Sequence, residues 1–282
     1  MSAPHPLRLR DVHGNALTPA GILATNAGNA SPQAVHAVEA LAGHAGLPFV
    51  HRRNRSIEQL FCDEAFDRLL VWPVAGQPQL HRRGGAGPLF YHPGMGLVRI
   101  KRLADGHEDD RLLIASGVRP GDRVLDCTAG LGSDAVVWSH AVGAQGICTA
   151  LEARAGIAQL FAIARATHET GVAAFDTALR RVDARCAAFR EAFAVLPDDS
   201  YDIVYFDPMF DASVEGSHAM RLMRDFADLT DVTRSDLGHA LRIARRAVVI
   251  KGRRDSALWR ELGVAQVGRN SGQVAYGLVP RR

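Results

Sequence analysis

The chain has 282 residues, 47% of them hydrophobic, which is enough for one large domain or for two unequal ones with separate cores. Its formal net charge of +3 permits an anionic partner but does not require one. The four cysteines form no Cys-x-x-Cys pair and the twelve histidines show no metal-ligand spacing, so we expect neither a disulfide framework nor a metal site. Because there is no basic-then-apolar leader pattern and no apolar run of membrane-spanning length, we expect a cytoplasmic protein without a membrane span.

Residues 1–88 have the pattern of a small α/β region. Ser31 and Pro32 are a favourable N-cap and first residue for a helix that ends near Gly46, and Ser56 opens a second helix that ends near Phe66. Strands are predicted at residues 21–27, 48–51 and 69–74. The glycine- and arginine-rich stretch at 81–87 is either a linker or the loop of a hairpin. We therefore expect a small N-terminal region, residues 1–88, ahead of a larger domain, residues 89–282.

From Arg123 onward, apolar strands alternate regularly with helices. The predicted strands are residues 124–127, 147–152, 179–182, 201–206 and 247–251, and the predicted helices include residues 134–142 and 236–246. Such alternation implies right-handed crossovers and a parallel sheet. The last two apolar runs, residues 264–269 and 274–279, can form a terminal hairpin. The expected fold is therefore α/β and Rossmann-like, with a mostly parallel seven-stranded sheet whose final strand is antiparallel.

The strongest local motif is a strand, a glycine turn and a helix at residues 124–134. The strand ends in Asp126, and ligands of open α/β sheets bind at the carboxyl ends of strands. Gly130 and Gly132 let the backbone approach a ligand closely, and the following helix N-terminus favours a negative group such as the carboxylate of a methionine moiety. The run Gly-Leu-Gly-Ser-Asp lacks the third glycine of the dinucleotide fingerprint, which disfavours a nicotinamide-dependent oxidoreductase and suits S-adenosylmethionine, a cofactor without a pyrophosphate. An ordinary strand–turn–helix is the alternative for this segment alone.

Acidic residues are predicted at the ends of the next two strands as well. Glu152 follows the glycine turn by about 20 residues, the spacing at which an acid accepts hydrogen bonds from both ribose hydroxyls. Asp183 is placed at the end of the third strand, where an acid can meet the adenine amino group. Each acid alone would more often be a surface carboxylate, but together with Asp126 they favour a cofactor site.

The fourth predicted strand ends in Phe206-Asp207-Pro208-Met209-Phe210. This run is similar to the (Asp/Asn)-Pro-Pro-(Tyr/Phe) signature of enzymes that methylate exocyclic amines of nucleobases. Such an amine is a poor nucleophile because its lone pair is delocalised into the ring. The Asp207 carboxylate and the Pro208 carbonyl can each accept an N–H bond and turn the lone pair toward the methyl donor, while Phe210 can stack on a base that has left its duplex. The alternative is an ordinary Asp-Pro turn after a strand.

Taken together, the runs D-C-T-A-G-L-G-S-D, F-D-P-M-F and V-V-I-K resemble a family of class I S-adenosylmethionine-dependent methyltransferases. Its characterised branch is the bacterial small-subunit ribosomal RNA guanine-N2 methyltransferases. A little-characterised branch is more similar, because it shares F-V-H-R-R-N-R-S-I-E-Q-L and Y-H-P-G-M-G-L-V-R-I-K-R-L, so that the resemblance covers about residues 47–254. The ribosomal branch tends to have arginine in place of Ser133, so the resemblance implies the chemistry more directly than the target nucleotide.

The resemblance and the motifs together give the expected site residues. The expected cofactor contacts are Asp126, Thr128, Gly130, Gly132, Ser133, Asp134, Glu152, Ala153, Asp183, Ala184 and Asp207. The expected catalytic residues are Asp207, Pro208 and Phe210. The expected substrate contacts are Met209, Lys251, Lys101 and the basic group Arg52, Arg53 and Arg55, for which a solvated surface is the alternative. Lys101 and Lys251 are the two lysines among 33 basic residues, and a retained lysine can mark a place that needs a compact ammonium group.

The reaction expected from the sequence is methylation of the N2 amine of a guanine in ribosomal RNA. One alternative within the same enzyme class is N6-methylation of adenine in RNA or DNA. An alternative of another class is a non-catalytic RNA-binding protein that retains a cofactor pocket. The intact Asp207-Pro208-Met209-Phe210 run argues against that alternative, because a protein that only binds RNA has no need of an amine-orienting geometry.

Overall fold

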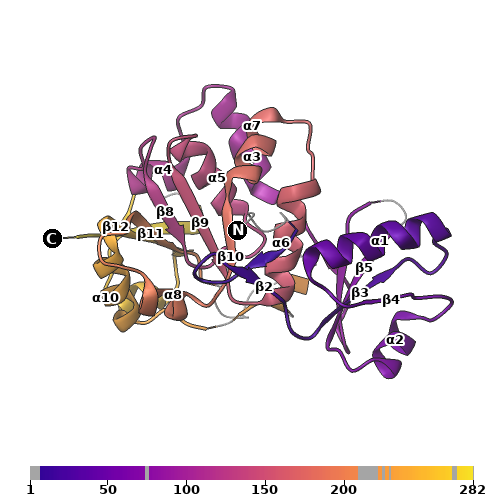
Figure 1. Cartoon of the computed structure of the whole chain (residues 1–282). Coiled ribbons are helices and arrows are strands. Elements are labelled where there is room, and N and C mark those ends of the chain that lie inside the picture. Colours follow the sequence, from indigo (N-terminus) through magenta and orange to yellow (C-terminus); the bar gives the residue numbers. More distant parts are fainter. Residues whose placement is uncertain are drawn as a thin grey trace.

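The computed structural model describes residues 7–73, 76–208, 222–223, 226–228, 230–268 and 272–281. It contains a larger and a smaller β-sheet, each with helices packed against it. The two sheets with their helices lie side by side in Figure 1. A two-stranded hairpin of β1 (Leu9–Arg10) and β2 (Ala16–Leu17) packs against the larger part although it precedes the smaller one in sequence.

The smaller sheet has five strands in the order β4-β3-β5-β6-β7. Its elements are β3 (Ile22–Asn26), α1 (Pro32–Ala45), β4 (Phe49–Val50), α2 (Ile57–Asp63), β5 (Arg68–Trp72), β6 (Gln79–Arg82) and β7 (Leu89–Phe90). The first three strands are parallel, and β6 and β7 extend them as an antiparallel hairpin. The glycine- and arginine-rich stretch is therefore a hairpin loop, and the smaller sheet extends to residue 90.

The helices of this region begin where their capping residues predict. The Ser31 hydroxyl accepts a hydrogen bond from the Ala34 amide at 3.2 Å, and Gly46 closes α1 in the left-handed conformation at φ +73°. Ser56 and Gln59 cap α2 reciprocally, with N···O distances of 3.1 and 2.7 Å. Because capping is a local interaction, the sequence was sufficient to place these helix starts.

The larger sheet has seven strands in the order β10-β9-β8-β11-β12-β14-β13, with β14 antiparallel to both neighbours. Its strands are β8 (Arg123–Asp126), β9 (Ile147–Glu152), β10 (Asp183–Cys186), β11 (Tyr201–Phe206), β12 (Ala244–Arg253), β13 (Gln266–Val267) and β14 (Val274–Pro280). Its helices are α3 (Gly94–Ala104), α4 (Arg111–Ser116), α5 (Ser133–Val142), α6 (Ala155–Thr167), α7 (Ala173–Arg181), α8 (Phe189–Val195), α10 (Arg234–Ile243) and α11 (Leu258–Leu262). The predicted Rossmann-like α/β fold with an antiparallel final strand is confirmed.

The predicted third strand at residues 179–182 is wrong. This segment is the end of α7, and β10 begins at Asp183, the residue that the prediction placed after the strand. Phe175, Ala178 and Leu179 are all fully buried at the i, i+3, i+4 spacing of one helix face, so Leu179 belongs to the apolar stripe of a helix.

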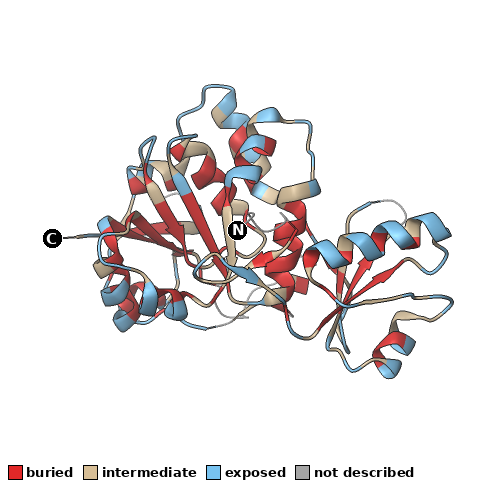
Figure 2. Ribbon diagram, in the orientation of Figure 1, coloured by how far each residue is buried: buried red, intermediate tan, exposed pale blue. Residues whose placement is uncertain are grey.

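Helix α6 joins the two parts of the molecule. Ile157 and Leu160 pack in the core of the smaller sheet with α1, while Phe161 packs in the core of the larger sheet. Ala158 contacts Leu9 of the hairpin from a third side. The helix is therefore apolar around most of its circumference, and Figure 2 shows it as a buried element between the two sheets.

Candidate active site

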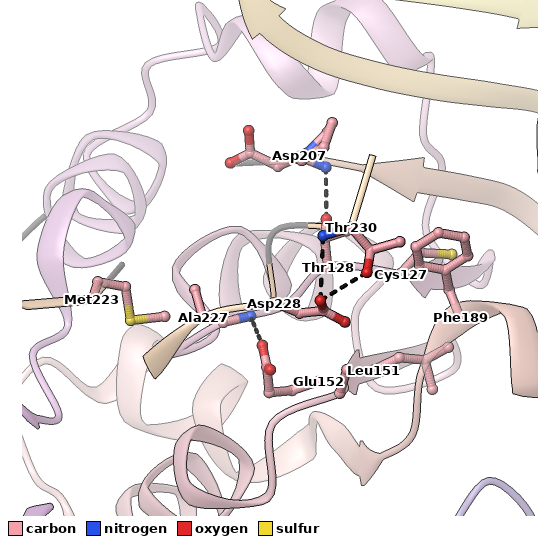
Figure 3. A pocket seen from close by; sticks show the side chains of 13 residues that line it. Cys127, Thr128, Leu151, Glu152, Phe189, Asp207, Met223, Ala227, Asp228 and Thr230 are labelled. Atoms are coloured by element: carbon pink, nitrogen blue, oxygen red, sulfur yellow. Dashed lines mark hydrogen bonds between the residues drawn. The ribbon is translucent and has the colours of Figure 1, made fainter. Parts of the chain in front are cut away.

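Parallel strands β8, β9, β11 and β12 end at the same edge of the larger sheet, where a cleft opens (Figure 3). Six of the residues expected from the sequence line this cleft: Thr128, Gly130, Glu152, Ala153, Asp207 and Pro208. Residues from three different strand ends are therefore brought together, as expected for ligand sites at the carboxyl edge of an open α/β sheet.

The glycine turn between β8 and α5 is fixed by backbone conformation and by close packing. Gly132 has φ +82°, and its amide donates to the Ala129 carbonyl at 2.8 Å. A Cβ atom on Gly132 would lie 2.1 Å from the Phe161 ring of α6, so only glycine fits. The turn thereby presents the amide of Gly130 to the cleft side of the sheet.

Glu152 is held by this turn and by its own loop. Its carboxylate accepts one hydrogen bond from the Gly130 amide at 3.0 Å and another from the Arg154 amide at 2.7 Å, one on each oxygen. Burial raises the pKa of Glu152 to about 7, although the two amide donors act in the opposite direction. Each carboxylate oxygen retains acceptor capacity, which suits a vicinal diol.

Thr128 and Asp126 connect the ends of the two central strands. The Thr128 amide donates to the Asp126 carboxylate at 3.1 Å, and the Thr128 hydroxyl accepts from the Asp207 amide at 2.7 Å (Figure 3). Asp126 is buried, and desolvation together with the nearby Asp134 raises its pKa well above the ordinary value. Asp126 therefore supports the Thr128 loop from beneath the cleft instead of lining it.

Asp207 follows β11 and presents its carboxylate beside the cleft, with 34% of the side chain exposed. Its Oδ2 accepts a hydrogen bond from Lys251 Nζ at 2.7 Å, and the same ammonium donates to Asp134 Oδ2 at 2.8 Å. Burial raises the pKa of Asp207, whereas the Lys251 ammonium lowers it. Lys251, which the sequence suggested as a substrate contact, is thus bound to two carboxylates.

Two expected cofactor residues lie away from the cleft. Asp183 and Ala184 are at the beginning of β10 and pair with Thr149 and Ala150, whereas Cys186 is level with Glu152. Asp183 forms ion pairs with Arg10, at 3.0 Å, and with Arg185, at 2.7 Å. This position follows from the misplaced third strand, because Asp183 opens β10 instead of ending a strand. The assignment of Asp183 and Ala184 as cofactor contacts stays a prediction.

Ser133 and Gly132 contact other parts of the chain instead of the cleft. The Ser133 hydroxyl accepts a hydrogen bond from the Gly96 amide at 3.0 Å, which fixes the start of α3 on the start of α5. Neither residue lines the cleft. Their assignment as cofactor contacts stays a prediction, as does that of Asp134, whose carboxylate binds Lys251 and Tyr205.

The expected substrate residues are spread over the molecule. Arg52, Arg53 and Arg55 lie in the loop after β4 of the smaller sheet. Arg55 forms ion pairs with Asp63 and Glu64, while Arg53 is exposed and has φ +53°. Lys101 is exposed on α3. Met209 and Phe210 lie outside the described residues.

Several residues of the cleft were missed by the sequence interpretation. They are Cys127, Leu151, Phe189, Met223, Ala227, Asp228 and Thr230. Cys127 and Leu151 directly adjoin predicted site residues, so their position was available from the strand pattern. Arg154 holds Ala227 and Asp228 at the cleft. It donates a hydrogen bond of 3.3 Å to the Ala227 carbonyl and forms an ion pair of 3.7 Å with Asp228. No sequence motif predicts these contacts.

The described residues contain neither a candidate membrane span nor a metal-binding cluster. Across the described ranges, no helix combines the length and the hydropathy that crossing a membrane requires. Within the same part of the chain, no cluster of three or more histidine, cysteine, aspartate or glutamate side chains has a metal-binding arrangement.

Comparison with known proteins relates this fold and cleft to methyltransferases. Residues 87–264 match the family model described as "Putative SAM-dependent methyltransferase". The chain is 32% identical to the uncharacterized protein YpiP of Bacillus subtilis (strain 168), over 88% of this chain and 95% of YpiP. It is 30% identical to ribosomal RNA small subunit methyltransferase J of Stutzerimonas stutzeri (strain A1501), over 67% of this chain and 73% of that enzyme. Among solved structures, the SAM-dependent methyltransferase NGO1261 from Neisseria gonorrhoeae has a TM-score of 0.54 at 19% identity, over 92% of this chain and 96% of that one, which is a likeness of fold.

The fold and the cleft define a class I methyltransferase that uses S-adenosylmethionine as its cofactor. The cleft fits this cofactor chemically, because Glu152 supplies acceptors for hydroxyl groups, Leu151 and Phe189 supply apolar walls for a flat ring, and the carboxylates of Asp207 and Asp228 suit a sulfonium cation. The chain belongs to the S-adenosylmethionine-dependent methyltransferase family of the matching model, with YpiP and the ribosomal RNA methyltransferase J as relatives.

Proposed function

We propose that this protein methylates an exocyclic amine of a nucleobase in RNA, with N2 of a guanine in ribosomal RNA as the favoured acceptor. The observation that carries the proposal is the position of Asp207 and Pro208, which follow β11 and line the cleft beside Glu152. The 30% identity to a ribosomal RNA methyltransferase supports RNA as the substrate class.

The chemistry follows from what the residues can accept. S-adenosylmethionine supplies an electrophilic methyl group on a sulfonium. Within the described ranges, Lys251 binds Oδ2 of Asp207 and no residue donates to Oδ1. The Pro208 carbonyl is a second acceptor one residue further along. Two acceptors that bind the two N–H groups of an amine draw its nitrogen toward tetrahedral geometry, which releases the lone pair for attack on the methyl carbon. The carbon–sulfur bond would break as the nitrogen–carbon bond forms, so that the sulfur would leave as a neutral thioether. The methylated nitrogen would then lose its surplus proton to the Asp207 carboxylate or to water.

The backbone around Asp207 makes this arrangement rigid. The Asp207 amide is bound to the Thr128 hydroxyl, and the proline ring of Pro208 restricts φ. A preorganised acceptor contributes most when its geometry is set before the reaction begins, because it then needs no reorganisation in the transition state.

We assign the RNA-contacting role to the smaller region, residues 1–88. Its loop after β4 carries Arg52, Arg53 and Arg55. Of these, Arg53 is the best candidate for a phosphate contact, since it is exposed, whereas the Arg55 guanidinium is bound to Asp63 and Glu64. Lys101 on α3 is a second exposed cation that can meet the backbone of the substrate.

Substitution of Asp207 tests the mechanism. Asp207→Ala is expected to slow single-turnover methyl transfer by about 10²–10³, the usual cost of losing one oriented polar group in a transition state. Asp207→Asn keeps an acceptor oxygen in the same shape and is expected to retain partial activity. Rates are normalised to folded protein and to cofactor-bound enzyme. A near-wild-type rate in Asp207→Ala would refute the amine-orienting role.

The acceptor base is identified by nucleoside mass spectrometry of RNA from a deletion strain. Loss of N2-methylguanosine from small-subunit ribosomal RNA supports the favoured acceptor. Loss of N6-methyladenosine would assign the alternative base, and an unchanged set of methylated nucleosides in both RNA and DNA would contradict the proposed substrate class.

A further inference from the structure

A row of partly buried charges of alternating sign leads from the start of α4 to the cleft. It starts at Asp110, the N-cap residue of α4, whose carboxylate binds Arg99 of α3 through two hydrogen bonds of 2.7 and 2.9 Å. Arg99 also donates to Oδ1 of Asp134 on α5. Lys251 of β12 links Asp134 to Asp207, which ends the row at the cleft.

Lys251 is aligned with Asp207 by the sheet itself. Strands β11 and β12 are parallel neighbours in which Phe206 pairs with Ile250. Asp207 directly follows β11, and Lys251 is the next residue of β12. The two carboxylates that flank the ammonium are 2.7 and 2.8 Å from Nζ. The lysine is therefore fixed on both sides, and with 23% of its side chain exposed it is largely withdrawn from solvent.

Asp134 is in turn fixed from three directions. Its Oδ2 accepts from Lys251 and from the Tyr205 hydroxyl, the latter at 2.7 Å, while its Oδ1 accepts from Arg99. Asp134 is buried, so these donors replace the water that its carboxylate would otherwise need. A carboxylate held in this way is a rigid anchor for the Lys251 ammonium.

We propose that Lys251 is a positioning residue for methyl transfer, which binds Oδ2 of Asp207 and leaves Oδ1 free for the acceptor amine. Asp134, backed by Arg99 and Tyr205, sets the position of the lysine. This inference rests on the proposed function of Asp207, and it replaces the sequence-based expectation that Lys251 contacts the substrate.

A lysine suits this place better than an arginine would. A compact ammonium can donate to two carboxylates on opposite sides, whereas a planar guanidinium is matched to one carboxylate through a fork of two N–H groups. The chain otherwise uses arginine for nearly all of its cations, with Lys101 as the other lysine. The geometry gives the retained lysine at 251 a physical reason.

The lysine also determines the charge of Asp207. An opposite charge at this distance favours the ionised carboxylate by about 1–3 pK units, which opposes the effect of burial. The other ionisable groups that act on Asp207 or Lys251 come from five elements: Asp126 of β8, Asp134 of α5, Tyr205 of β11, Arg99 of α3 and Tyr276 of β14. Asp126 and Asp134 disfavour ionisation of Asp207. When Lys251 is removed, Arg99 is the one cation of this group that still favours it.

The test is a titration of the Asp207 carboxyl group by carbon NMR of aspartate-labelled protein, with Asp207→Asn used to assign the signal. In Lys251→Met, we expect the midpoint to rise by about 1–3 pH units. Lys101→Met, which removes the same ammonium from an exposed position on α3, is the matched control for the titration and is expected to leave the midpoint unchanged. An unchanged midpoint in folded Lys251→Met overturns the proposal.

The pH dependence of methyl transfer is a second measurement, and a purely structural role of Lys251 would not change it. Single-turnover methyl transfer by Lys251→Met is expected to fall by about 10² at neutral pH, by analogy with other oriented polar groups, and to recover as pH rises through the new midpoint. Lys251→Arg retains a cation in a poorer geometry and is expected to be intermediate. A rate loss with the same pH dependence as the wild type would overturn the proposal.

Two further comparisons keep the outcomes separate. If Lys251→Met does not fold, the charge-balanced pair Lys251→Met/Asp134→Asn is compared with Asp134→Asn alone, and the same rise in the Asp207 midpoint is expected. Failure of the proposed function appears as unaltered methyl transfer in Asp207→Ala. In that case the Asp207 midpoint still rises in Lys251→Met. If instead the positioning role of Lys251 is wrong, the Asp207 midpoint does not change in Lys251→Met, while methyl transfer still depends on Asp207.

Discussion

Replacement of Gly132 by alanine tests whether the glycine turn is fixed by packing. An alanine at φ +82° is expected to cost about 1–2 kcal/mol in backbone strain. Its Cβ would also lie 2.1 and 2.2 Å from two atoms of the Phe161 ring, and that ring is only 1% exposed, so it has little room to move. Overpacking of this kind costs about 1–3 kcal/mol, and the free energy of unfolding should therefore fall by about 2–5 kcal/mol.

The matched control is Gly117→Ala at the end of α4. Gly117 is also left-handed, at φ +59°, but among the described residues no atom outside Gly117 and its two chain neighbours lies within 4 Å of its added Cβ. Only the backbone cost of about 1–2 kcal/mol is expected there. Urea unfolding of both variants and the wild type gives the comparison, provided that the dependence of free energy on urea concentration has the same slope in all three.

A double variant separates the two contributions at Gly132. In a Phe161→Leu background the ring is absent, so Gly132→Ala should lower the free energy of unfolding by an amount closer to that of Gly117→Ala. The difference between the two backgrounds is the coupling energy of the two residues in contact. The reasoning is refuted if Gly132→Ala costs no more than Gly117→Ala, or if its cost is the same with and without the Phe161 ring.

Four further predictions concern the cofactor, pH and RNA. Glu152→Ala should weaken S-adenosylmethionine binding by about 1–3 kcal/mol in calorimetry, and unchanged affinity would remove Glu152 from the site. Burial raises the pKa of Glu152 to about 7, above its ordinary value near 4.5, so the folded protein holds this proton more tightly than the unfolded chain. The contribution of Glu152 to the free energy of unfolding should therefore fall as pH rises from 4.5 to 7, and urea titrations of the wild type and Glu152→Gln that run parallel over this range would contradict it. Asp183→Asn should leave cofactor affinity unchanged, since Asp183 lies away from the cleft, and a several-fold loss in calorimetry would restore the sequence-based assignment. Arg53→Glu should weaken RNA binding and flatten the slope of log affinity against log salt by about one, and an unchanged slope would assign Arg53 to the solvated surface.

Local patterns were sufficient for much of the fold. Strands β9 and β11 have the predicted bounds, residues 147–152 and 201–206, because each is a mostly apolar run of strand length. The same reasoning failed at residues 179–182, because the run Leu-Arg-Arg-Val is apolar only at its two ends and fits the last turn of a helix as well as a short strand. That single error displaced Asp183 from the end of one element to the start of another.

The sequence by itself determined the α/β fold, the glycine turn, Glu152 at the end of its strand and Asp207-Pro208 after the fourth strand, because each depends on residues close together in the chain. The tertiary structure alone decided what those residues touch. Lys251 and Asp134 are 117 residues apart, and Ser133 and Gly96 are 37 apart. Gly132, at the start of α5, contacts Phe161 of α6. No local pattern encodes such pairs, because the sheet order and the packing of α3 and α6 on α5 bring them together.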